Sequence, residues 1–141
     1  MSCVRSPSTT PRVQKKAMDK YTTMVETEAQ KEWRLPNGWL HRGGDLPASI
    51  WFNGRKEWWQ NNKRHRDGDL PAVIRADGDK EWWKTGKMHR DGDLPAIIRA
   101  DGSKVWMQDN KLHRDGGLPA VINADGTMEW WQRGRLLYYN D

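Results

Sequence analysis

The chain has 141 residues, which is enough for one domain or for one repeat array with a tail. Hydrophobic residues make up only 35%, yet ten of them are tryptophan, and this balance favours a thin fold with a narrow core over a thick globule. The net charge of +5 is a small excess over 19 acidic residues. Cys3 is the only cysteine, which excludes an intrachain disulfide, and no apolar run approaches the roughly 20 residues of a membrane-spanning helix.

The first 30 residues differ in composition from the rest of the chain. Residues 1–12 are rich in Ser, Thr and Pro, which predicts a flexible start. Apolar residues then recur at helical spacing in a stretch without Gly or Pro: Val13, Ala17, Tyr21, Met24 and Val25. We therefore expect an N-terminal tail over 1–30, partly helical or disordered. Its helix would cover the open end of the array or, alternatively, dock a partner.

Residues 31–141 repeat with a period of about 24. Histidine marks the period at His41, His65, His89 and His113, and each is followed by a closely similar segment such as HRDGDLPAVI. Tryptophan follows the same period, in the motifs KEWW, KVWM and MEWW. The repeats run over about 31–55, 56–79, 80–103, 104–127 and a truncated 128–141.

Within one repeat, turn residues separate short extended segments. Residues 72–76 and 80–84 read as strands, and Asp77-Gly78 between them is a hairpin turn pair. Thr85-Gly86 is a second turn signal, and residues 87–90 form a third extended piece. The sequence therefore predicts an all-β fold, an elongated array of antiparallel β-hairpins with about 24 residues per repeat.

Two tryptophan positions behave differently along the array. The first is tryptophan in every copy, at 33, 58, 82, 106 and 130, which predicts a continuous buried ladder. The second position varies between Arg34, Trp59, Trp83, Met107 and Trp131. Because arginine is accepted there, we expect this row to face solvent more often.

The pattern resembles the MORN (membrane occupation and recognition nexus) repeat in a diverged form. The family pattern has an Asp-Gly turn and then Trp, two residues, Gly, two residues and His, and Trp83, Gly86 and His89 match that spacing. Arg follows the His where the family has Gly, and the DLPA segment is additional. The variant is similar to repeat proteins of large DNA viruses and phages. The resemblance implies stacked hairpins and an interaction role, without a particular ligand.

Recurring polar motifs carry other interpretations. His-Arg-Asp at 65–67, 89–91 and 113–115 has the letters of a kinase catalytic loop, but the following Asn and the Gly-rich loop are missing. Equivalent histidines would lie about 10 Å apart, too far to share one metal ion. We expect each histidine to bond a turn carbonyl or an Asp, and the Asp-Gly-Asp runs to be turns. The sequence predicts no enzyme, cofactor or metal site.

The prediction for function is a non-enzymatic scaffold for protein–protein interaction or assembly. The alternative is a nucleic-acid-binding protein that uses a Trp/Arg surface and the basic tail. For either function the arginine row is an exposed basic stripe or, alternatively, a solvated Arg–Asp network. The candidate partner-binding residues are Trp59, Trp83, Trp131, Arg66, Arg90, Arg114, Arg75 and Arg99.

The sequence also gives expectations about interaction modes and cellular localisation. A weak association with a membrane surface and homo-oligomers formed through the array ends are two additional interaction modes. The single cysteine and the absence of an apolar segment at the start favour an intracellular protein. That means the cytoplasm or, for a viral protein, the host cytoplasm or the virion.

Overall fold

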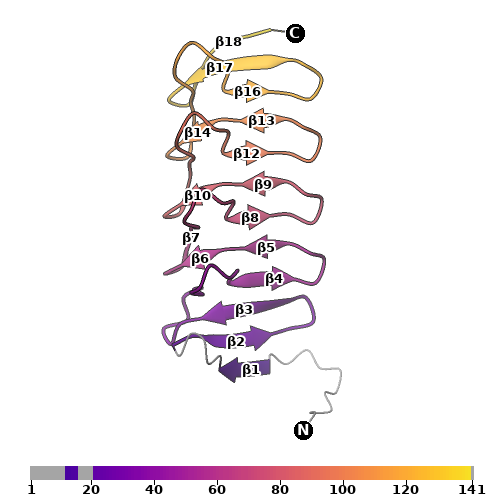
Figure 1. The fold of residues 1–141 in the computed structure, drawn as a ribbon, viewed down its shortest axis with the longest axis vertical. Coiled ribbons are helices and arrows are strands. Elements are labelled where there is room, and N and C mark those ends of the chain that lie inside the picture. Colours follow the sequence, from indigo (N-terminus) through magenta and orange to yellow (C-terminus); the bar gives the residue numbers. More distant parts are fainter. Residues whose placement is uncertain (1–11, 16–20, 141) are drawn as a thin grey trace.

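The computed structural model describes residues 12–15, by their backbone, and 21–140 in full. In these ranges every regular element is a β-strand, and the strands stack into an elongated antiparallel array (Figure 1). The predicted all-β hairpin array is confirmed. The same turn, strand and loop recur along the axis, one level per repeat.

One long sheet of twelve antiparallel strands runs the whole length of the array. In spatial order its strands are β1 (Arg12–Lys15), β2 (Thr23–Glu26), β3 (Gln30–Arg34), β4 (Ser49–Trp51), β5 (Lys56–Glu57), β8 (Val73–Ile74), β9 (Lys80–Glu81), β12 (Ile97–Ile98), β13 (Lys104–Val105), β16 (Val121–Ile122), β17 (Met128–Gln132) and β18 (Arg135–Asn140). Each repeat adds one hairpin to this sheet, so equivalent residues form rows across it.

Three small hairpins stand beside the long sheet. They pair β6 (Trp59–Gln60) with β7 (Lys63–Arg64), β10 (Trp83–Lys84) with β11 (Lys87–Met88), and β14 (Met107–Gln108) with β15 (Lys111–Leu112). Backbone bonds join these hairpins between repeats, as where Gly86 N–H donates to the Arg64 carbonyl at 2.9 Å. Each repeat therefore contacts its neighbour along two columns, the long sheet and the small hairpins.

Two turn types set the local chain path. In the first, the Gly78 N–H donates to the Arg75 carbonyl, and Gly78 has a φ of 100° that glycine adopts without strain. The second is a two-residue turn at Thr85-Gly86, where both φ angles are positive, as the hairpin's twist requires. The predicted turns at both positions are confirmed.

The core is narrow and built from rows of like residues. The first tryptophan of each complete repeat is buried, and the alanine of each LPA segment has no exposed surface, as at Ala72 and Ala96. Each of these alanines accepts a backbone hydrogen bond from the first tryptophan of the repeat, such as Trp82 to Ala96 at 2.8 Å. The predicted ladder is confirmed at Trp33, Trp58, Trp82 and Trp106, while Trp130 is only half-buried.

The amphipathic helix expected between Val13 and about Lys31 is wrong for the described residues. Strands β1, β2 and β3 occupy much of this range and continue the long sheet. Met24 is buried in register with Trp33, so its apolar side chain serves the sheet core rather than a helix face. The expected flexible start falls on residues 1–11, outside the described ones.

The opposite end of the array is closed by β18. This strand pairs along the full length of β17, with an irregular register between Trp130 and Trp131. In the earlier repeats the chain turns away from this position into the HRDGDLP loop, whereas here it continues straight.

Among the described residues no helix is long and apolar enough to cross a membrane.

Candidate functional site

The arginine of each HRD motif joins two successive repeats. The guanidinium of Arg90 lies 3.9 Å from the ring centroid of Trp82, donates through Nε and Nη2 to Asp69 of the preceding repeat, and donates through Nη1 to the Pro95 carbonyl. Trp82 Nε1 in turn donates to the Asp69 carbonyl at 3.1 Å. We call this arrangement the Arg–Asp–Trp latch.

The latch recurs at equivalent positions. Arg66 covers Trp58 and bonds Asp45, and Arg114 covers Trp106 and bonds Asp93. The three arginine side chains are only 12–14% exposed. The expected Arg–Asp pairs are therefore present, each with an aspartate of the repeat before. The exposed basic stripe is wrong, because each guanidinium is packed on an indole.

The latch arginines lower the pKa values of the aspartates that they bond. Hydrogen bonds from Arg66 lower the pKa of Asp45 below its ordinary value of 3.8, and those from Arg114 lower the pKa of Asp93 in the same way. The left-handed backbone at Asp45 and Asp93, with φ of 54° and 55°, aims each carboxylate at the next repeat. At the array start Arg42 covers Trp33 at 3.6 Å, and burial lowers its pKa.

The second tryptophan row is more exposed than the buried first row, as expected, but it is only half-buried and its indoles are hydrogen-bonded. Trp59 Nε1 donates to Glu57 at 2.9 Å, and Trp83 Nε1 donates to Glu81 at the same distance. Both glutamates are buried on the inner face of the sheet. These indoles donate hydrogen bonds to buried carboxylates, and without such donors burial of the carboxylates would lower the stability of the array.

One repeat replaces the whole pair. Val105 stands where the other repeats have glutamate, and Met107 stands where they have tryptophan or Arg34. Val105 belongs to an apolar cluster with Ile97 and Val121, against which Met107 packs. Where this position is glutamate, the residue two places later is a hydrogen-bond donor, tryptophan or arginine. Where it is valine, the residue two places later is methionine, which donates no hydrogen bond.

The remaining arginine candidates lie near the first turn of the repeat. Arg75 donates to buried Glu81 at 2.8 Å. Arg99 is about half exposed, and its Nη1 lies 3.8 Å from Asp79. The structure thus places the eight predicted residues on several surfaces, and most of them hold the framework together.

Each histidine joins two repeats through Nδ1, which accepts a backbone N–H of the next repeat. His89 Nδ1 accepts the backbone N–H of Asp109 in the next repeat at 3.1 Å, so its ring proton lies on Nε2, which faces Asp91 at 2.8 Å. His65 makes the same bonds to Thr85 and Asp67. The expected aspartate partner is confirmed, but the second partner is a turn N–H rather than a carbonyl.

The histidines do not converge on a shared centre. Within the described ranges, no three His, Cys, Asp or Glu side chains are grouped as metal ligands. Hydrogen bonds from His89 and Lys84 lower the pKa of Asp91. Among the described residues these His–Asp contacts therefore form local pairs that recur from one repeat to the next.

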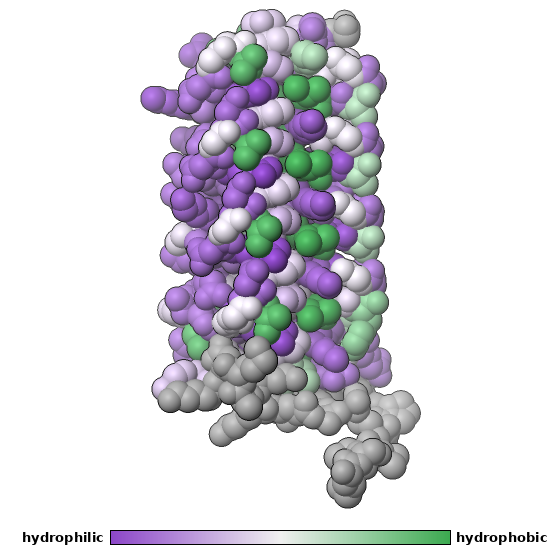
Figure 2. Space-filling view, viewed as in Figure 1, coloured by the Kyte–Doolittle hydropathy of each residue, from purple (hydrophilic) through white to green (hydrophobic). Residues whose placement is uncertain are grey.

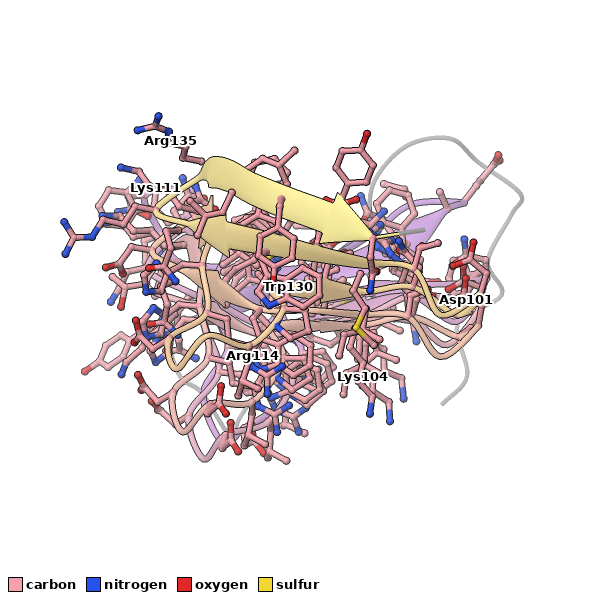
Figure 3. The ribbon with its side chains drawn as sticks, turned by 90° about the horizontal axis from the view of Figure 1, so that it is seen from above. Asp101, Lys104, Lys111, Arg114, Trp130 and Arg135 are labelled. Carbon is pink, nitrogen blue, oxygen red and sulfur yellow. The ribbon has the colours of Figure 1, made fainter. Side chains whose placement is uncertain are left out.

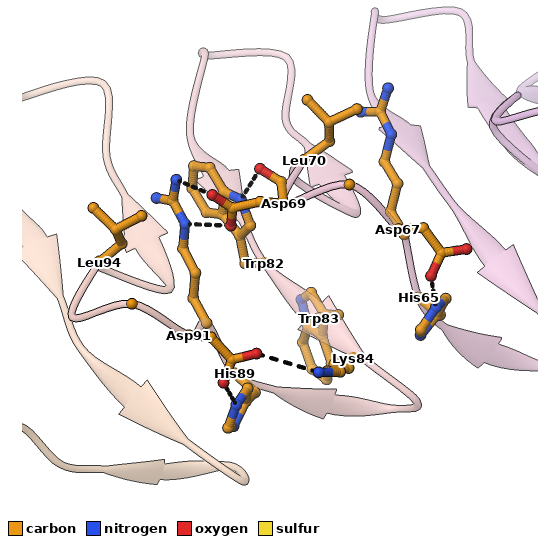
Figure 4. Close-up of a pocket in the computed structure, with 14 residues that line it drawn as sticks. His65, Asp67, Asp69, Leu70, Trp82, Trp83, Lys84, His89, Asp91 and Leu94 are labelled. Atoms are coloured by element: carbon orange, nitrogen blue, oxygen red, sulfur yellow. Dashed lines mark hydrogen bonds and ion pairs between the residues drawn. The ribbon is translucent and has the colours of Figure 1, made fainter.

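A row of exposed leucines lies along the HRDGDL loops. Leu70, Leu94 and Leu118 are 40–42% exposed. Leu70 and Leu94 both line a groove of about 390 Å³ between two successive loops, whose floor includes Trp82 and Trp83 (Figure 4). Equivalent grooves of about 300 and 440 Å³ precede and follow it. We call this surface the leucine groove row.

Sequence reasoning missed this row because leucine at a regular interval reads as core. The available signal was its place between Asp or Gly and Pro, in a loop with two positive-φ residues where a side chain has no strand neighbour to pack on.

In comparisons with known proteins, no protein-family model, curated protein or solved structure matches this chain.

Proposed function

We propose that this protein is a non-enzymatic scaffold of MORN-like repeats that binds an extended segment of a partner protein along the leucine groove row. The single observation that carries this proposal is the repetition of one apolar contact and one groove per repeat. Exposed apolar side chains that line a groove are typical of a peptide-binding surface.

The spacing of the row fits an extended chain. Two strands per repeat place equivalent leucines about 10 Å apart, and an extended peptide covers that distance in about three residues. In the extended polyproline II conformation, which turns once every three residues with a rise of about 3.1 Å per residue, a partner segment with apolar residues at every third position would therefore place one side chain in each groove. Because the hydrogen-bonded array holds its grooves at a fixed distance from one another, it favours partner segments whose apolar residues have the same spacing.

The charge of the row favours a basic partner. Each groove is rimmed by carboxylates that point to solvent, among them Asp67 and Asp115, whose side chains are 94% and 90% exposed. The arginines of the same loops are committed to the Arg–Asp–Trp latches and contribute little free positive charge. Lysine or arginine between the apolar residues of the partner would meet these carboxylates.

The proposal is tested by selecting binders from a random peptide library displayed on phage. We expect the selected peptides to share apolar residues three apart with basic residues between them. A variant with Leu70→Ser, Leu94→Ser and Leu118→Ser should lose these binders. The matched control carries Leu136→Ser and Leu137→Ser on β18, which leaves the grooves intact and should retain them.

Two outcomes contradict the proposal: peptides with no shared period, and equal loss of binding in both variants. The resemblance to repeat proteins of large DNA viruses and phages makes a component of a viral assembly the first natural partner to test. An intracellular site of action is part of the same proposal.

A further inference from the structure

We propose that the outer face of the long sheet is a second binding surface, which holds single-stranded nucleic acid through Lys56, Lys80 and Lys104. We call these three residues the lysine ladder. They belong to β5, β9 and β13, at the same position of three successive repeats. Lys56, Lys80 and Lys104 line none of the grooves of the leucine groove row, and the inference does not depend on the scaffold function proposed above.

The strand register places the ladder in a straight row. Lys56 lies opposite Ile74, Ile74 opposite Lys80, and Lys80 opposite Ile98, and the order continues through Lys104 to Ile122. Lysine and isoleucine therefore alternate across the sheet, with about 10 Å between successive lysines. Figure 2 shows hydrophobic and hydrophilic side chains alternating along this face of the array.

The ladder carries positive charge that the protein itself does not neutralise. All three lysines are exposed, and each has isoleucine on both sides across the strands. Among the described residues none of the three forms an ion pair. This contrasts with the arginines of the latches, which are all paired with an aspartate. A row of free ammonium groups at fixed spacing attracts a polymer that is negative along its whole length.

The chemistry of the row favours the nucleic-acid backbone as ligand. Lysine and isoleucine offer no acceptors and no planar pairs of donors for reading base edges, so contacts would go to phosphates, without regard to sequence. Nucleic acid presents a phosphate at every unit, and some phosphate always lies within reach of each flexible lysine. An acidic protein would need carboxylates placed to match the 10 Å spacing.

The straightness of the row favours a single strand over a duplex. The ladder spans about 20 Å, whereas a strand of a B-form duplex returns to the same side only once per turn of about 34 Å. A straight row therefore meets a duplex backbone at only one or two of its lysines. A single strand has no fixed helical path and can follow all three.

The experiment is fluorescence anisotropy of labelled oligothymidylate with the full chain over a range of salt concentrations. Three phosphate contacts to a single strand predict a slope of log K against log salt of about −2. The variant Lys56→Gln, Lys80→Gln, Lys104→Gln should bind at least about tenfold more weakly at low salt, with a slope near zero.

A matched control removes the same number of charges from another edge. Lys63→Gln, Lys87→Gln and Lys111→Gln change residues of the small hairpins, and Lys111 points away from the side of the array that carries Lys104 (Figure 3). This variant should keep most of the affinity and most of the slope. Far-ultraviolet circular dichroism of both variants should match the unchanged protein.

Four results overturn the inference. They are no binding of oligothymidylate at low salt, equal losses in the two triple variants, tighter binding of a duplex of the same length, and equally tight binding of polyglutamate. The last result would assign the ladder to an acidic protein surface instead.

Discussion

Tyr138 stacks on Trp130 with ring centroids 4.3 Å apart and an interplanar angle of 12°. The tyrosine occupies the place that Arg114 holds over Trp106 one repeat earlier. The aspartate that a latch would require, 21 residues before, is Gly117 in this last repeat. Arginine and aspartate are thus replaced together, and a neutral aromatic pair covers the final indole.

We predict that a latch can be rebuilt at this end. Tyr138→Arg alone should destabilise the protein by about 1 kcal/mol, because the ring stacking is lost and no carboxylate faces the new guanidinium. Gly117→Asp together with Tyr138→Arg should recover about that amount, since aspartate tolerates the left-handed backbone. Urea unfolding of the four proteins in a double-mutant cycle gives the coupling energy, and a coupling of zero would refute the latch geometry.

The buried glutamate row predicts a second coupling. Trp83→Met should destabilise by about 1–3 kcal/mol, because it removes the indole donor from buried Glu81. Glu81→Val with Trp83→Met reproduces the pair found at Val105 and Met107 and should cost less than Trp83→Met alone. Free energies of unfolding in urea measure both variants. A double variant less stable than Trp83→Met would contradict this account.

The histidine bridges predict a local effect rather than a global one. His89→Phe removes the acceptor of the Asp109 N–H, and the loss of about 1 kcal/mol should speed hydrogen exchange at that amide about fivefold. His89→Asn keeps an acceptor near the position of Nδ1 and should preserve most of the protection. Exchange followed by NMR resolves the amide, and equal protection in both variants would rule out the bridge.

The latch aspartates predict a loss of stability in acid. Because the pKa of Asp45 and of Asp93 is lower in the folded protein than its ordinary value of 3.8, their contribution is fully present above about pH 4. It is lost as the pH falls through the lowered values. Unfolding free energies measured downward from pH 7 should therefore decline below pH 4, and less steeply with Asp45→Asn and Asp93→Asn. Parallel curves would contradict the prediction.

The periodic features of the sequence predicted the periodic features of the fold. Glycine and aspartate specified the turns, and the invariant first tryptophan specified the buried ladder, since both depend on local chemistry that repeats with the chain. The spacing of Val13, Tyr21 and Met24 misled, because isolated apolar residues suit a helix as well as strands whose partners lie elsewhere. Strand pairing with another part of the chain decides between helix and strand, and it cannot be recognised from one segment alone.

The expected solvent exposure of the arginine row was wrong for a related physical reason. Arginine and tryptophan are enriched at binding sites, but they are also the side chains best able to cover an indole or satisfy a buried carboxylate. Arg90 reaches an aspartate 21 residues earlier, beyond any neighbourhood that sequence adjacency suggests. The joint change to Val105 and Met107 was the available signal that glutamate and tryptophan act as a pair.

Every latch arginine bonds an aspartate that precedes it in the chain, as Arg66 does with Asp45 and Arg90 with Asp69. The aspartate of a latch has therefore already been synthesised when its arginine is added to the chain. Each level can dock on the one before it during synthesis, without waiting for distant sequence. A nascent chain interrupted at a repeat boundary would leave a shorter column whose existing latches are all complete.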